Sequence, residues 1–276
     1  MLLAHSDAVS ESASHKNGLH EKISCEKLSD PTEKHTQNDL RSEKGKRTAF
    51  GFISSSTSHT DDIFKIDRQK SRLKRMKCGT LTTVRLHDEE VQKLKYRTYC
   101  IMITLTYAKV DGWHPDHISK FMNTVRTWCK RSKIDPRYAW VAELQKRGAV
   151  HYHVVMWLPK AFRLPMPDKR GWWKHGSTKI ETVRKSVAYL AKYLSKDDTD
   201  SFPKGCRIHG HGGLSESSRN ERCWWLMPTW VREITSIDDK PRRAKGGGIV
   251  LKSSGEILES PWKVLITNLG VYITRA

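Results

Sequence analysis

Residues 138–158 read YAWVAELQKRGAVHYHVVMWL, and this stretch decides the fold. Apolar residues dominate both halves and flank a short polar segment, Lys146-Arg147-Gly148. Runs of this length that are rich in β-branched and aromatic residues predict strands, and the polar segment predicts a tight turn. The sequence therefore indicates an antiparallel hairpin with strands over residues 138–145 and 149–158.

Further strands and two helices are predicted around this hairpin. Residues 99–107 (YCIMITLTY) predict a core strand, and residues 179–183 a short one. Apolar side chains at helical spacing predict a helix over residues 115–131 and a second over 183–196. The element order β-α-β-β-β-α predicts an α+β fold, an antiparallel sheet with helices packed on one face.

Composition limits the class of protein. The 276 residues include 50 Lys/Arg against 30 Asp/Glu, a formal net charge of +20. A basic chain with many aromatic residues suits a polyanion such as nucleic acid. No apolar run is long enough for a membrane helix or a signal peptide. The six cysteines form no Cys-x-x-Cys pair, which favours a reducing cytoplasm.

The chain is expected to have three parts. Residues 1–80 carry 15 Lys/Arg against 11 Asp/Glu and few large apolar side chains, so they predict a disordered basic leader. Residues 81–235 form the expected folded domain. Residues 236–276 read as a flexible joint and a C-terminal tail, with short strands allowed over 262–266 and 270–274.

Two histidines of the hairpin point to a metal. In His151-Tyr152-His153 the imidazoles fall on the same face of a strand, about 7 Å apart. Glu143 precedes the turn and could supply an oxygen to the same ion. Two imidazoles and a carboxylate suit manganese, zinc or iron and, less naturally, magnesium. The alternative is a pair of half-buried histidines that neighbouring side chains satisfy.

Two other segments have competing interpretations. His209-Gly210-His211 has the same spacing but is glycine-rich, which favours a turn. Residues 171–178 (GWWKHGST) resemble a phosphate-binding loop but carry Ser177 where its lysine should be, so triphosphate binding is not expected. Trp172, Trp173 and Lys174 either stack on displaced bases or pack under the sheet.

The helix over 183–196 contains Tyr-x-x-Lys twice in tandem. Tyr189, Lys192, Tyr193 and Lys196 share one helical face, away from the leucine–valine stripe. Tyrosines on an amphipathic helix often pack in a core, and the neighbouring lysines weaken that interpretation. A phenolate beside ammonium groups indicates attack on a phosphodiester, with a metal polarising the phosphate oxygens.

Taken together, these motifs resemble those of the HUH endonucleases, and in particular the rolling-circle replication initiators with two active-site tyrosines of filamentous and other small single-stranded DNA phages. Residues 103–107 are similar to the first family motif, His151-Tyr152-His153 to the metal motif and residues 189–193 to the nucleophile motif. The resemblance covers roughly residues 96–215. It implies an HUH/RRM-like, ferredoxin-like sandwich. The family motif usually has an aliphatic residue where this chain has Tyr152.

The resemblance also implies an activity. His151 and His153 would bind Mg²⁺ or Mn²⁺, and Glu143 would complete the set. Tyr189 would nick single-stranded or supercoiled origin DNA, leaving a 3′-hydroxyl and a 5′-phosphotyrosine, and Tyr193 would make the second strand transfer. Lys192 and Lys196 would stabilise charge or move protons. The expected partners are origin DNA, a host helicase and the replication machinery in a bacterial cytoplasm, with no membrane and no nucleoside triphosphate.

Two alternatives stay open at this point. A non-catalytic DNA-binding replication regulator on the same fold would bind an origin without cleaving it. An RNA-binding protein of similar sheet topology would bind RNA and DNA equally well, and its helix tyrosines would have no role in cleavage.

Overall fold

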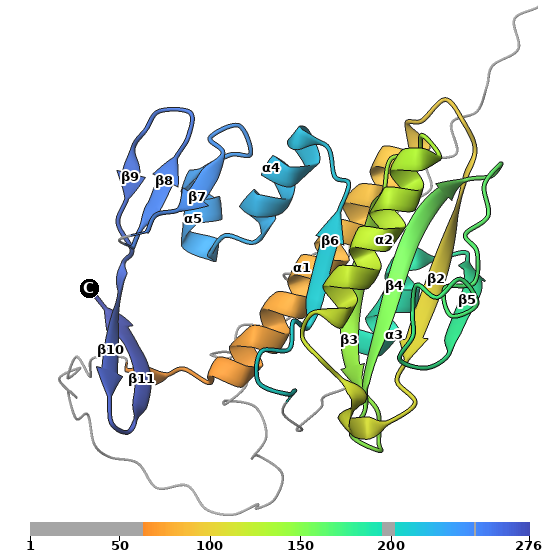
Figure 1. Ribbon diagram of the computed structural model, residues 1–276. Helices are drawn as coiled ribbons and strands as arrows, with labels where there is room; N and C mark the ends of the chain where they lie inside the picture. The colour runs from red at the N-terminus through yellow and green to blue at the C-terminus, as the bar shows by residue number, and fades with distance from the viewer. Residues whose placement is uncertain (1–62, 195–201, 246) are drawn as a thin grey trace, which may run out of the picture. The chain divides into compact units, whose positions relative to one another are not determined.

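The computed structural model describes residues 63–194, 202–245 and 247–276, and all of them belong to one unit, residues 57–276. Its centre is a fully antiparallel five-stranded sheet (Figure 1). The strands in spatial order are β5 (Thr178–Val183), β2 (Thr98–Thr106), β4 (Val150–Pro159), β3 (Arg137–Leu144) and β6 (His209–Gly212). The α+β class predicted from the sequence is confirmed.

The helices lie on both faces of this sheet. The helices are α1 (Arg68–Gln92), α2 (His117–Arg131), α3 (Ser186–Leu194), α4 (Glu216–Trp225) and α5 (Thr229–Ile234). On one face, Trp157 of β4 donates to Asp88 of α1, and His153 stacks on Tyr193 of α3. On the other face, α2 packs through Phe121 and His117 against Trp173 and Tyr107. The expectation of helices on a single face is therefore wrong, because β4 is apolar on both faces.

Helix α1 begins inside the segment expected to be a disordered leader. The Asp67 carboxylate caps it by accepting from the backbone N–H of Gln69 and Lys70, both at 2.9 Å. The helix buries small and polar side chains, including Thr80 and Thr83, and shows no leucine stripe. A boundary at residue 80 divides this helix, so the structure differs from the expectation over residues 63–80. Residues 1–62 lie outside the described part of the chain.

Two small sheets account for most of the C-terminal segment. One consists of β7 (Pro241–Arg243), β8 (Ile249–Leu251) and β9 (Ile257–Leu258). The other consists of β1 (Phe64–Lys65), β11 (Gly270–Arg275) and β10 (Trp262–Thr267). Both short strands expected near the C-terminus are therefore present, although residues 236–261 are more regular than a flexible joint.

The second His-x-His sequence is a strand and not the expected turn. It forms β6, which pairs with β3 from Tyr138↔Gly212 to Val141↔His209. A Cβ atom at Gly210 would lie 2.5 Å from the ring of Trp140, and one at Gly212 would lie 2.6 Å from that of Tyr138. The glycines are needed because these two rings cross over the strand.

Membrane-spanning helices are absent from the described residues. None of the helices there combines the length and the apolar composition that a bilayer crossing requires.

Candidate metal centre and tyrosine helix

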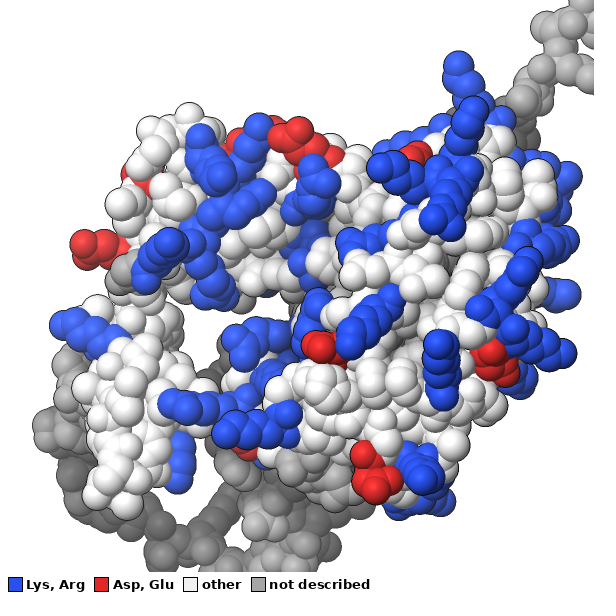
Figure 2. Space-filling model, viewed as in Figure 1, with Lys and Arg blue, Asp and Glu red and all other residues white. Residues whose placement is uncertain are grey.

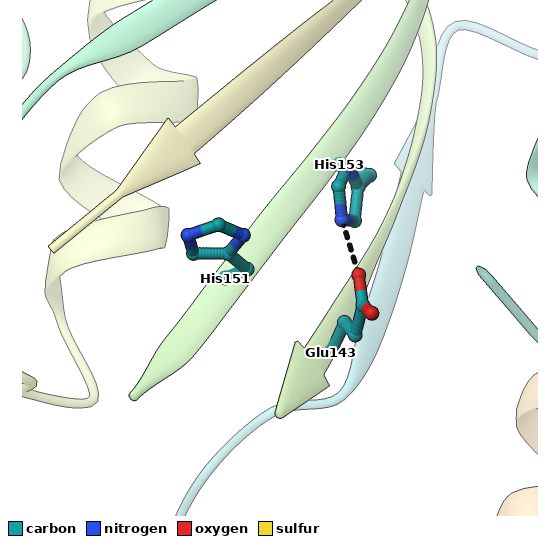
Figure 3. A group of neighbouring side chains, drawn as sticks. All are labelled: Glu143, His151 and His153. Carbon is teal, nitrogen blue, oxygen red and sulfur yellow. Dashed lines mark hydrogen bonds and ion pairs between the residues drawn. The ribbon is translucent and has the colours of Figure 1, made fainter. Parts of the chain in front are cut away.

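The β3–β4 hairpin places the three predicted ligands together. Glu143 pairs directly with His151, and His153 lies two residues further along the same face of β4. One ligand atom from each residue lies within 4.8 Å of the others, so the group could hold a metal ion. Figure 3 shows the two imidazoles and the carboxylate converging from neighbouring strands.

His153 is held in place on both sides. Its Nε2 lies 2.7 Å from Oε2 of Glu143, and its Nδ1 lies 3.4 Å from Oγ1 of Thr104 on β2 (Figure 3). Both partners of the close pair are buried, at 4% exposure for His153 and 6% for Glu143. A carboxylate facing Nε2 holds the ring in one orientation. A divalent cation would take the place of the shared proton between the same two atoms.

The donor set fits a divalent transition metal. Two imidazole nitrogens and one carboxylate oxygen favour Mn²⁺, Zn²⁺ or Fe²⁺, and Mg²⁺ less so, because Mg²⁺ prefers oxygen ligands. Three protein ligands leave coordination positions for oxygens of a substrate.

Helix α3 directs its tyrosines at this group. The Tyr193 ring stacks on that of His153, with centroids 3.8 Å apart and planes inclined by 22°. Tyr189, one turn earlier, has its ring centroid 5.9 Å from that of Tyr193. Burial raises the pKa of Tyr193 to about 12, and the nearby Tyr189 and Glu143 act in the same direction. The metal ligands and the tyrosine face thus lie in direct contact.

Asp88 of α1 positions α3 over the sheet. Its carboxylate accepts from Nε1 of Trp157 on β4 at 2.8 Å and also from the hydroxyl of Ser186, the first residue of α3. Burial raises the pKa of Asp88, and these two hydrogen bonds oppose that rise. Sequence reasoning missed Asp88 because it did not predict α1. The one available signal was the acidic end of that segment.

The lysines of the tandem motif are only partly described. Lys192 lies within α3, but its side chain and the whole of Lys196 lie outside the described residues. Lys179 of β5 is a cation that sequence reasoning missed. It pairs with Thr104 in the register, so it shares the face of His153. Its hydrogen bond to Glu181 raises its pKa, as does the charge of Tyr189 to a smaller extent. Alternation along residues 179–183 could have revealed this placement.

The second His-x-His motif lies on the same face but has different surroundings. Val141 of β3 pairs with His153 on one side and with His209 on the other. Burial lowers the pKa of His209 to about 4 and that of His211 to about 3, and the cation of Arg222 lowers both further. In the described part of the chain, neither histidine joins a group that could hold a metal.

Comparison with known proteins agrees with this geometry. Residues 100–198 match the family model of the Replication-associated protein ORF2. The match runs from β2 to just beyond α3, so it includes the metal group and both tyrosines. It covers about a third of the chain. No curated protein and no solved structure matches the chain.

Proposed function

We propose that this protein initiates rolling-circle DNA replication by nicking origin DNA through a tyrosine in a metal-dependent reaction. The observation that carries the proposal is the stacking of Tyr193 on His153, with Glu143 and His151 at the same point. Nucleophile and metal ligands then meet on one phosphate. The match to a replication-associated family over the same residues supports the assignment.

The chemistry is a transesterification. The phenolate oxygen of a tyrosine attacks the phosphorus of a phosphodiester, the bond to the 3′-oxygen breaks, and a proton is transferred to that oxygen to give a 3′-hydroxyl. The 5′-phosphate stays linked to the tyrosine. A bound divalent cation would polarise the phosphate oxygens and stabilise the charge of the transition state. His151, His153 and Glu143 would hold Mg²⁺ or Mn²⁺.

The two tyrosines allow two such reactions in one site. Tyr189 makes the first attack in this proposal, and Tyr193, one turn further on, accepts the strand in the second and closes the circle. The spacing of their rings supports a shared phosphate position. Lys192, Lys196 and the newly placed Lys179 supply positive charge beside the phosphate. A host helicase would unwind the duplex, since residues 171–178 lack a phosphate-binding lysine.

The surface charge suits a DNA partner. Lysine and arginine side chains outnumber acidic ones on the face drawn in Figure 2. Cationic surfaces bind the DNA backbone by releasing counterions, so the affinity should fall steeply as salt rises. The exposed cations Arg68, Lys70, Arg72 and Lys74 along the first half of α1 provide one such surface.

The test is cleavage of supercoiled DNA that carries the replicon's own origin, with Mn²⁺ present. The expected product is a nicked circle with the protein joined to its 5′ end, and peptide mass analysis identifies the linked tyrosine. Tyr189→Phe together with Tyr193→Phe should abolish the product, whereas Tyr96→Phe, an exposed tyrosine outside the site, should not. A double variant that nicks as well as the wild type refutes the nucleophiles. Origin binding without any cleavage favours the non-catalytic regulator.

A further inference from the structure

The exposed side of α2 forms one wall of a pocket that contains two tryptophans. The pocket has a volume of about 270 Å³. The indole rings of Trp128 and Trp172 lie 6.3 Å apart with planes inclined by 55°. The other lining residues are polar or cationic: Asn123, Thr124, Thr127 and Arg131.

The sequence of α2 separates this pocket from the core. Thr124, Trp128 and Arg131 recur at spacings of four and three residues, so they follow one stripe of the helix. The buried residues form a second stripe, consisting of Ile118, Phe121, Met122, Val125 and Cys129. Trp128 lies at the border of the two stripes, which explains its half-buried state. One edge of its ring is fixed by the core while the rest faces the pocket.

A structured loop presents the second indole. The backbone N–H groups of Trp172 and Trp173 both donate to the carbonyl of Pro167, at 2.8 and 3.2 Å. The Trp173 ring is buried, and its Nε1 donates to the carbonyl of Thr106 at 3.1 Å. Trp173 therefore anchors the loop, and Trp172 is left half-exposed at the pocket. A ring held in this way loses little conformational freedom when it binds a partner.

The charges around the pocket favour a polyanion with planar groups. The lining contains Arg131 and no carboxylate. Asp168, the acid of the loop, uses its carboxylate to accept from the backbone N–H of Lys169 and of Thr178. Indole faces stack on nucleobases, a guanidinium pairs with phosphate, and amide and hydroxyl groups hydrogen-bond to base edges.

We propose that this pocket binds one unpaired base of single-stranded DNA, with the adjoining phosphate on Arg131. It lies with α2 on the face of the sheet opposite the group of Glu143, His151 and His153, so it is a second contact with DNA and takes no part in cleavage. The choice of DNA as the partner rests on the proposed function. The contact would hold the displaced strand unpaired while the tyrosine site acts.

Binding can be tested without any cleavage. The Tyr189→Phe, Tyr193→Phe chain is titrated in EDTA with a fluorescein-labelled oligo(dT), and fluorescence anisotropy gives the affinity. Trp172→Ala should weaken binding about tenfold, because stacking on one base is worth roughly this much. Trp172→Phe should recover part of the loss, since phenyl rings also stack.

Arg131 has a matched control on the same helix. Arg131→Ala and Lys130→Ala each remove one exposed cation, and only Arg131 lines the pocket. Arg131→Ala should weaken binding several-fold more than Lys130→Ala at the same salt concentration. Equal losses would reduce Arg131 to a general surface charge and would overturn its assignment.

A photo-crosslink locates the base. An oligonucleotide that contains 5-iodouracil should crosslink to the peptide of Trp172 or of Trp128. Crosslinks confined to other peptides, or wild-type affinity of Trp172→Ala, would overturn the proposal and leave the pocket to a partner of another class. Loss of binding by the pocket variants in a chain that never nicks DNA would instead refute only the nickase.

Discussion

The two His-x-His motifs stand on the same face of one sheet, separated by β3, yet only one forms a candidate metal centre. His153 lies beside a buried carboxylate, Glu143, whereas His209 lies near the cation of Arg222. A carboxylate attracts a divalent ion and holds the ring, and a guanidinium repels the ion. The comparison teaches that the surrounding charge, and not the spacing of the histidines, selects the metal site.

The largest expected effect separates the motifs by activity. His151→Ala should reduce origin nicking by more than about 100-fold, because a metal ion supplies several kcal/mol to such reactions. His211→Ala should leave nicking largely intact. Most of the DNA affinity should survive in both variants, since it comes from the basic surface. Similar losses of nicking in the two, with circular dichroism showing both folded, would end the distinction drawn above.

Metal affinity tests the role of the carboxylate. Glu143→Gln keeps the shape and one hydrogen-bond acceptor but removes the charge, so Mn²⁺ binding should weaken by more than about tenfold. Calorimetric titration measures the affinity. Glu181→Gln is the control, because Glu181 is a nearby acid that pairs with Lys179 at 2.9 Å. The metal site needs revision if the control loses as much affinity as Glu143→Gln.

Stability tests the middle residue of each motif. Gly210→Ala would place a Cβ atom 2.5 Å from the buried ring of Trp140 and should destabilise the fold by about 1–3 kcal/mol. Tyr152→Phe keeps its ring and loses only the hydroxyl that accepts from Nε1 of Trp113 at 2.8 Å, at a cost of about 1 kcal/mol. Urea denaturation compares the two variants. A neutral Gly210→Ala would show that the ring of Trp140 moves freely.

The smallest expected effect concerns protonation of the second motif. His209 has a folded-state pKa of about 4 because of burial and nearby arginines, against about 6.5 in an unfolded chain. Between these values the unfolded state binds more protons, so stability falls as the pH drops from about 6.5 to about 4 and then levels off. Urea midpoints at pH 7 and pH 5 measure this loss.

A substitution shows which histidine causes that loss. His209→Gln should lose less stability between pH 7 and pH 5 than the wild type. His114→Gln, at a solvent-exposed histidine, should behave as the wild type does. If the loss on acidification is the same in all three chains, burial of His209 contributes nothing to the pH dependence.

The sequence by itself determined the hairpin, the shared face of Glu143, His151 and His153, and the tyrosine face of α3. These follow from local periodicity, because alternation in a strand and the turn of a helix fix which side chains are neighbours. The expected strands and helices between residues 98 and 194 lie within a few residues of the observed ones.

Only the tertiary structure decided what covers each face. Helix α1 escaped prediction because it buries glycine, threonine and histidine, and such residues pack closely only against a surface that the sequence does not display. Strand β6 escaped because its glycines serve the rings of Trp140 and Tyr138 on the neighbouring strand. The stacking of Tyr193 on His153 and the pocket of Trp128 and Trp172 join segments far apart in the chain. Contacts of this kind depend on packing between elements, which local patterns do not encode.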